Sequence, residues 1–181
     1  MRVITGTARG KRLLAPEGVE RTRPTTDRVK EAVFGALQFA VAGSRVLDAF
    51  AGSGALGIEA LSRGAREAVL VEKDRTVAPI LRQNLKNTAL TERARVIEGD
   101  FFDVAAQLGG RFDLIFLDPP YRAGLYEEAI ACILRHGLLA PGGRVIAEHD
   151  GSAPLGDLLV EVKRKKYGKS TVSFLAQEED A

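Results

Sequence analysis

The sequence predicts an α/β fold with a mostly parallel, seven-stranded sheet, helices on both faces and an antiparallel C-terminal strand. Apolar, β-branched runs alternate with helical patterns between residues 45 and 148, and continuous runs of this kind are typical of strands buried on both faces. A glycine-rich turn at Gly52, Gly54 and Gly57 follows the first run. Because 181 residues suit one medium-sized core, we expect one main domain.

The N-terminal part of the chain is expected to form a small hairpin and a helix. Two short apolar runs, Val3–Thr5 and Arg12–Ala15, flank a glycine-containing turn and predict the hairpin. Apolar residues at three-to-four spacing then predict a helix that is capped by Thr26 or Asp27 and ends near residues 42–43. The two expected units are an N-terminal extension, residues 1–42, and a main domain, residues 43–181.

The elements of the main domain follow from the same two periodicities. The expected strands are residues 45–50, 67–72, 94–98, 112–117, 143–148, 158–165 and 171–176. The expected helices are residues 55–63, 75–86, 103–108 and 127–135. The last two strands follow one another directly, which predicts an antiparallel pair.

Composition and charge exclude several classes of protein. No apolar run approaches the roughly 20 residues of a membrane span, and the first residues lack a signal-peptide pattern, so we expect a cytoplasmic protein. A single cysteine, Cys132, excludes an internal disulfide and is expected in the core. Two histidines, His136 and His149, form no cluster at metal-ligand spacing, so we expect no metal. The absence of a long apolar heptad pattern favours a monomer.

Basic residues gather near both ends of the chain although the net charge is only +2. Residues 1–30 hold eight basic and three acidic side chains, and a second basic run spans Lys163–Lys166. Such runs are either solvated surfaces or a footprint for a phosphate backbone, and charge alone leaves both interpretations open.

The glycine turn matches the G-x-G-x-x-G dinucleotide pattern, so the first question is which cofactor it holds. Asp48 stands at the end of the preceding strand, four residues before Gly52, where its carboxylate would oppose a pyrophosphate. The same carboxylate would attract an α-ammonium group and a sulfonium. The pattern therefore favours S-adenosylmethionine and disfavours a nicotinamide dehydrogenase.

Two further strand ends carry groups suited to a nucleoside. Glu72 follows the second strand and can accept hydrogen bonds from two ribose hydroxyls. Asp100 follows the third strand and can accept from an adenine amino group, while Phe101 covers the ring. Asp100 is also compatible with an ordinary helix cap.

The tetrapeptide Asp118-Pro119-Pro120-Tyr121, after the fourth strand, is the most specific signal. Its prolines fix the backbone so that the Asp118 carboxylate and the Pro119 carbonyl can face one point. Two acceptors without a donor suit an exocyclic amine of a base, whose lone pair they would turn toward a methyl group. Tyr121 can stack on the base. These four residues are the expected catalytic group.

These motifs resemble the RsmD family of bacterial 16S ribosomal RNA guanine-N2 methyltransferases, which are class I, Rossmann-like enzymes dependent on S-adenosylmethionine. The stretches that carry the resemblance are Arg9–Leu13, Arg23–Glu31, Asp48–Ala65, Asp118–Tyr121 and Tyr167–Gly168. The resemblance implies S-adenosylmethionine as cofactor and a guanine amine of 16S rRNA as target. The implied cofactor residues are Thr26, Arg28, Asp48, Ala49, Gly52, Gly54, Glu72, Lys73, Asp100 and Phe101, with Thr26 and Arg28 near the methionine end.

An RNA target gives the basic ends a role. The chain has no room for a separate target-recognition domain, whereas a structured RNA or a 30S particle can present a splayed-out base. The expected RNA contacts are Arg9, Lys11, Arg12, Arg21, Arg23, Lys163, Arg164, Lys165 and Lys166. The N-terminal extension, residues 1–42, is expected both to bind RNA and to cover the cofactor site. Two alternatives stay open: an adenine-N6 methyltransferase acting on DNA or RNA, and a non-catalytic RNA-binding protein of ribosome assembly.

Overall fold

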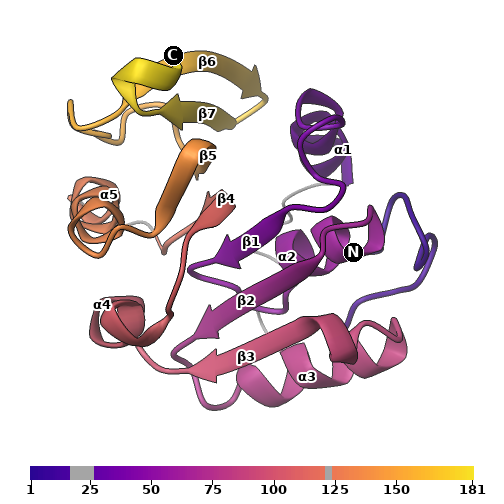
Figure 1. Cartoon of the computed structure of the whole chain (residues 1–181). Coiled ribbons are helices and arrows are strands. Elements are labelled where there is room, and N and C mark those ends of the chain that lie inside the picture. Colours follow the sequence, from indigo (N-terminus) through magenta and orange to yellow (C-terminus); the bar gives the residue numbers. More distant parts are fainter. Residues whose placement is uncertain (17–26, 121–123) are drawn as a thin grey trace.

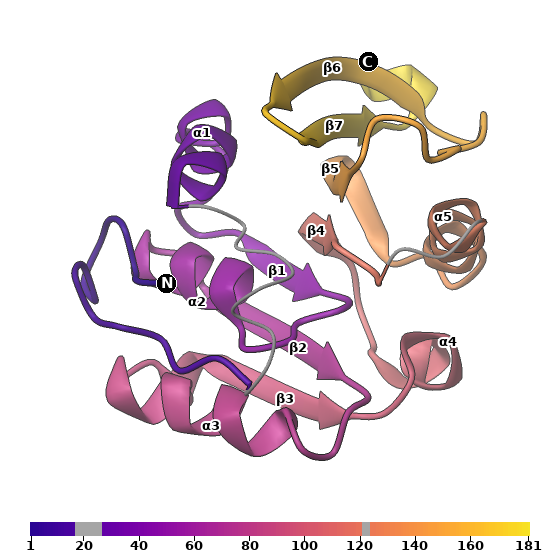
Figure 2. The same cartoon turned by 180° about the vertical axis from the view of Figure 1, so that it is seen from behind.

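The computed structural model describes residues 1–16, 27–120 and 124–181, and this part of the chain contains one seven-stranded sheet (Figures 1 and 2). The strand order is β3-β2-β1-β4-β5-β7-β6. The first five strands are parallel, β7 pairs antiparallel with β5, and β6 pairs antiparallel with β7. The strands are β1 (Arg45–Asp48), β2 (Glu67–Glu72), β3 (Ala94–Glu98), β4 (Phe112–Leu117), β5 (Leu139–His149), β6 (Val160–Tyr167) and β7 (Ser170–Ala176). The predicted fold class is confirmed.

Helices cover both faces of the sheet. The α-helices are α1 (Asp27–Ala36), α2 (Ala55–Ser62), α3 (Ala78–Asn87), α4 (Phe101–Val104) and α5 (Leu125–Arg135). Short 3-10 helices lie at Thr91–Arg93, Ala105–Gln107 and Glu178–Asp180. The first three α-helices contribute to one hydrophobic cluster, and α4 and α5 contribute to the other. Figures 1 and 2 show the two groups on opposite sides of the sheet.

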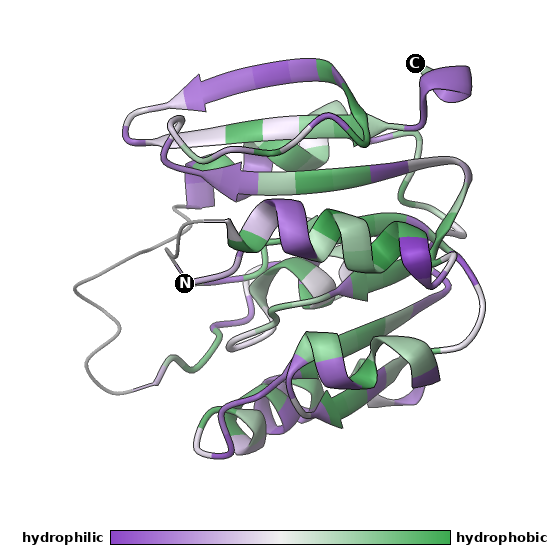
Figure 3. Cartoon of the chain, turned by 90° about the vertical axis from the view of Figure 1, so that its left-hand side faces the viewer, coloured by the Kyte–Doolittle hydropathy of each residue, from purple (hydrophilic) through white to green (hydrophobic). Residues whose placement is uncertain are grey.

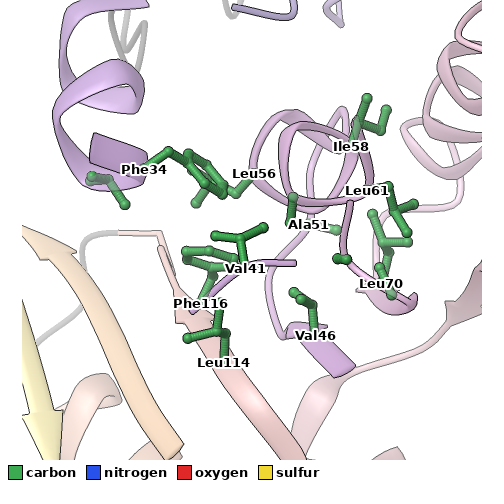
Figure 4. Packing of buried hydrophobic residues seen from close by; sticks show 14 of the residues in the cluster. Phe34, Val41, Val46, Ala51, Leu56, Ile58, Leu61, Leu70, Leu114 and Phe116 are labelled. Carbon is green, nitrogen blue, oxygen red and sulfur yellow. The ribbon is translucent and has the colours of Figure 1, made fainter. Parts of the chain in front are cut away.

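Successive side chains of a strand point to opposite faces of the sheet, so the hydrophobic core is divided between the two faces. Val46 and Leu70 face α2, whereas their neighbours Leu47 and Val69 belong to the cluster under α4 and α5. Figure 4 shows the first cluster, in which the ring of Phe34 on α1 lies 5.5 Å from that of Phe116 on β4. Each such fully buried side chain stabilises the fold by roughly 1.5–3 kcal/mol.

Several element boundaries differ from the predicted ones. The first helix ends at Ala36 instead of near residues 42–43, because Leu37 and Val41 reach the core through successive turns. The fourth helix begins at Phe101 instead of residue 103, because the Asp100 side chain caps it. The loop of the last hairpin has two residues instead of the expected five, since β6 extends to Tyr167, which pairs with Ser170.

The N-terminal segment forms a looser hairpin than predicted, with a single antiparallel bridge between Arg2 and Arg12. It lies along α2 and α3 (Figure 2). Glu59 on α2 accepts hydrogen bonds from the backbone N–H groups of Ile4 at 2.9 Å and Thr5 at 3.0 Å. Glu59 also pairs with Lys30 on α1 at 3.2 Å, and both side chains are fully buried. The segment is therefore anchored in the core of the main domain.

The outermost strand, β6, is largely hydrophilic, in contrast with the apolar interior strands (Figure 3). Its side chains from Val160 to Lys166 are exposed. Charged side chains on an edge strand oppose pairing with other sheets. Among the helices of the described residues, none has the length and apolar character needed to cross a membrane.

Candidate active site

Two adjoining hollows open at the carboxyl ends of the parallel strands, where α/β sheets bind their ligands. The larger has a volume of about 760 Å³ and the smaller about 480 Å³. Asp48 lines the larger hollow, Asp100 lines the smaller one, and Glu72 and Asp118 line both. The structure thus brings together the four strand-end carboxylates that the sequence placed at one edge.

Glu72 joins the turn after β1 to the turn after β2. One carboxylate oxygen accepts the N–H of Gly52 at 2.7 Å, and the other accepts the N–H of Asp74 at 2.7 Å. A carboxylate offers about four acceptor positions, so capacity for two more donors is left after these bonds. Glu72 can therefore hold the glycine turn and also receive two hydroxyl groups.

Glycine suits two positions of the turn for separate structural reasons. Gly52 has a φ of 54°, and a Cβ atom there would meet nothing within 4 Å. Gly52 borders both hollows, so a ligand there can approach the backbone of the turn. A Cβ atom at Gly57 would lie 2.6 Å from Leu70 Cδ2, so this glycine lets α2 pack closely on β2.

Asp48 is a buried carboxylate, with only 2% of its surface exposed. Its Oδ2 accepts the N–H of Gly57 in the first turn of α2 at 3.0 Å. Burial raises the pKa of Asp48 to about 7; the Gly57 hydrogen bond opposes this shift and the charge of Glu72 adds to it. A cation bound in the larger hollow would offset the desolvation and favour the ionised carboxylate.

The smaller hollow has an aromatic wall made of Phe50, Phe101 and Phe102. The centroid of Phe101 lies 5.7 Å from that of Phe50 and 5.5 Å from that of Phe102. Asp100 accepts the N–H of Phe102 at 3.1 Å as a helix cap, and its other oxygen lies 3.1 Å from Lys73 Nζ. The sequence analysis did not identify Phe50 and Phe102 as site residues, although aromatic residues beside two strand ends could have indicated them.

The proline-rich motif follows β4 directly and borders both hollows. Asp118 is half-buried and lines both, Pro119 is buried and lines the larger, and Pro120 is exposed and lines both. Strand β4 pairs with β1 so that Phe116 faces Asp48 across the ladder. Tyr121, the fourth member of the expected catalytic group, lies outside the described residues.

One wall of the larger hollow is formed by Met1 and by residues 12–16 of the N-terminal segment, which belongs to the extension expected to cover the cofactor site. Asn84 on α3 fixes this wall. Its Oδ1 accepts the N–H of Leu14 at 2.8 Å, and its Nδ2 donates to the carbonyls of Leu14 and Ser53, each at 2.9 Å. Asn84 is fully buried, and a polar residue between Leu81 and Leu85 on an apolar helix face was its signal in the sequence.

The other expected cofactor residues lie in different places. Ala49 lines the smaller hollow, whereas Gly54 caps the N-terminus of α2 and borders neither hollow. Arg28 is exposed on α1 and borders neither hollow. Thr26 falls outside the described residues.

The expected RNA contacts are spread over the surface. Arg9, Lys11 and Arg12 are exposed, and Arg12 borders the larger hollow. Arg9 lies near the far end of α2, because the N–H of neighbouring Ala8 bonds to Ser62 Oγ at 3.0 Å. The run Lys163–Lys166 is exposed on β6, with Arg164 paired to Glu161 at 2.8 Å. Arg21 and Arg23 lie outside the described residues.

Two other expectations concern cysteine and metal ligands. Cys132 is buried in the cluster under α5, as predicted, and burial raises the pKa of its thiol. Over the residues that the structure describes, no group of three His, Cys, Asp or Glu side chains is placed to hold a metal ion.

Comparisons with known proteins agree with this architecture. A family model described as "Conserved hypothetical protein 95" matches residues 1–176. The protein named "Ribosomal RNA small subunit methyltransferase D" of Escherichia coli (strain K12) is 42% identical over 150 residues, covering 83% of this chain and 75% of that protein. The structure of the Escherichia coli protein yhhF has a TM-score of 0.86 and 35% identity, covering 98% of both chains.

A more distant structure shares the fold alone. It is that of an RNA methyltransferase from Salinibacter ruber in complex with S-adenosyl-L-homocysteine. Its TM-score is 0.68 at 17% identity, and the likeness covers 86% of this chain and 95% of the other. The chain therefore has a class I methyltransferase fold.

Proposed function

The chain belongs to the family described as Conserved hypothetical protein 95, the RsmD family, and from this premise we propose that it methylates small-subunit ribosomal RNA with S-adenosyl-L-methionine. One observation carries the proposal. Asp118, the first residue of the motif expected to hold a base, borders the same hollows as Glu72 and Gly52 of the expected cofactor site. The Escherichia coli relative named for small-subunit rRNA methylation supports the substrate class.

The residues around the hollows fit the cofactor. The open space beside Gly52 admits a ligand against the backbone, the buried Asp48 suits an ammonium group, and Glu72 suits ribose hydroxyls. The aromatic wall of Phe50, Phe101 and Phe102 offers a surface for adenine. When bound, S-adenosyl-L-methionine supplies an electrophilic methyl group on a sulfonium.

The proposed target is the exocyclic N2 amine of a guanine. The Asp118 carboxylate and the Pro119 carbonyl accept its two N–H groups and turn the nitrogen lone pair toward the methyl group. An N–C bond forms as the S–C bond breaks, and the amine then releases one proton to Asp118 or to water. No covalent enzyme intermediate is needed, which agrees with Cys132 being a core residue. Tyr121 is proposed to stack on the base.

The substrate is proposed to be 16S rRNA within a 30S subunit or an assembly intermediate, bound by a monomer. Phosphates would be held by the exposed basic residues of the N-terminal segment and of β6. The proposed phosphate contacts are Arg9, Lys11, Arg12, Arg21, Arg23, Lys163, Arg164, Lys165 and Lys166.

Incorporation of labelled methyl into unmodified 30S subunits tests the proposal. Asp118→Ala should abolish incorporation while binding of S-adenosyl-L-homocysteine, measured by calorimetry, persists. Retained incorporation in this variant would contradict the role of Asp118. Mass analysis of the nucleoside should give N2-methylguanosine; N6-methyladenosine would replace the proposal by an adenine methyltransferase, and absent cofactor binding by the wild-type protein would favour a non-catalytic RNA-binding protein.

A further inference from the structure

The N-terminal segment adds exposed apolar side chains to the larger hollow, whose lining also holds the carboxylates of Asp48, Glu72 and Asp118. Met1 is 41% exposed and Leu14 is 49% exposed, and both border the larger hollow. Pro119 and Pro120 border the same hollow beside Asp118. An apolar wall thus accompanies the acceptors that are proposed to hold the amine.

The backbone of Leu14 is fixed more firmly than an exposed loop residue requires. Both its N–H and its carbonyl are hydrogen-bonded to the amide of Asn84, at 2.8 Å and 2.9 Å. The same amide donates to the carbonyl of Ser53 in the glycine turn at 2.9 Å. Because Asn84 is fully buried on α3, one rigid side chain sets the position of Leu14 relative to that turn.

From this arrangement we propose that Leu14 is a substrate contact that packs against the face of the target base, and that Asn84 is the positioning residue that holds it there. The proposal rests on the RNA methyltransferase function proposed above. A planar base presents apolar faces, which suit a leucine and two prolines. The amino-acid end of the cofactor is ionic and suits Asp48 instead, so the apolar wall is assigned to the base.

Leu14→Ala tests the contact, since an exposed residue can be truncated without loss of folding. We expect kcat/KM for unmodified 30S subunits to fall about tenfold, which is within the range for removing a leucine side chain from an apolar contact. The Kd for S-adenosyl-L-homocysteine should stay within twofold of the wild-type value. Leu158→Ala is the matched control, because Leu158 is similarly exposed, at 56%, and borders neither hollow.

Asn84→Asp tests the positioning role. This variant keeps the acceptor for the Leu14 N–H but loses the donors to the carbonyls of Leu14 and Ser53. Thermal unfolding identifies any loss of folding. We expect kcat/KM for 30S subunits to fall, and adding Leu14→Ala to Asn84→Asp should reduce it by much less than Leu14→Ala alone does, because both changes disturb one contact.

The outcomes separate this proposal from the proposed function. If Leu14→Ala methylates 30S subunits as fast as the wild-type protein, the contact is refuted while the function stands. If Leu14→Ala instead raises the Kd for S-adenosyl-L-homocysteine tenfold, Leu14 contacts the cofactor and the assignment to the base is wrong. Additive effects of the two substitutions would refute the positioning role of Asn84. If the wild-type protein methylates no 30S subunit, the proposed function itself fails.

Discussion

The affinity for S-adenosyl-L-homocysteine should fall as the pH is lowered from 7.5 to 6.0, because the buried Asp48 becomes protonated. Its pKa is raised to about 7, chiefly by burial. The ionised fraction is then about three-quarters at pH 7.5 and about one-tenth at pH 6.0. If only the carboxylate binds the ammonium group, the apparent Kd rises about eightfold over this range. Isothermal titration calorimetry at several pH values measures it directly.

Two controls test whether Asp48 causes the change of Kd with pH. The variant Asp48→Asn keeps an acceptor for the Gly57 N–H but cannot ionise, so it should bind the ligand more weakly at pH 7.5 and with little pH dependence. The ligand 5′-methylthioadenosine lacks the amino-acid group, so its Kd should vary little with pH in the wild-type protein. An unchanged wild-type affinity between pH 6.0 and 7.5 would refute the reasoning, as would an equal slope in Asp48→Asn.

The Asp48 carboxylate also makes the stability of the unliganded protein depend on pH. The folded pKa of Asp48 lies above its ordinary value of 3.8, so the folded state binds a proton that the unfolded state releases. This contribution to stability is fully present below pH 3.8 and is lost as the pH rises through about 7. At pH 7.5, Asp48→Asn should therefore raise the free energy of unfolding, by up to about 4 kcal/mol.

Two further predictions concern buried polar groups. Glu59→Ala leaves Lys30 buried without its 3.2 Å partner, and urea unfolding should show a loss of about 3–5 kcal/mol; a loss below about 1 kcal/mol would contradict the structural role of this pair. Burial, followed by the charge of Arg164, lowers the pKa of His149 below 6.5, so its contribution to stability should be present above pH 6.5 and lost as the pH falls through the lowered value. Melting temperatures of wild-type protein and His149→Gln should diverge least at acid pH, and parallel curves would refute this assignment.

The carboxylates of the site were predictable because they depend on local sequence and one topological rule. Asp48 and Glu72 each end a strand that its own apolar pattern reveals. Parallel strands then bring their carboxyl ends to one edge, whatever their separation in sequence. The glycine turn was equally local, since Gly52 and Gly57 follow their strand within ten residues.

The sequence predicts that the N-terminal extension covers the site, but which residues form and hold that wall depends on contacts between distant segments. Asn84 forms hydrogen bonds with Leu14, which lies 70 residues away in the sequence. The local sequence around either residue does not predict its contact with the other. The predicted end of α1 was wrong for a related reason. Leu37 and Val41 are buried at helical spacing, but turns can place two side chains in a core as well as a continuous helix can.

The anchoring of the N-terminal segment determines how its function can be separated from its structure. Val3 and Leu13 belong to the same hydrophobic cluster as Val46 of β1, and Glu59 bonds to the segment while it pairs with Lys30. Deleting residues 1–16 would therefore uncover a buried ion pair and part of the core, and would also remove a wall of the larger hollow. A loss of activity after such a deletion could not distinguish lost folding from lost recognition. The exposed side chain of Leu14 is the better probe, because its truncation leaves every anchoring hydrogen bond of the segment intact.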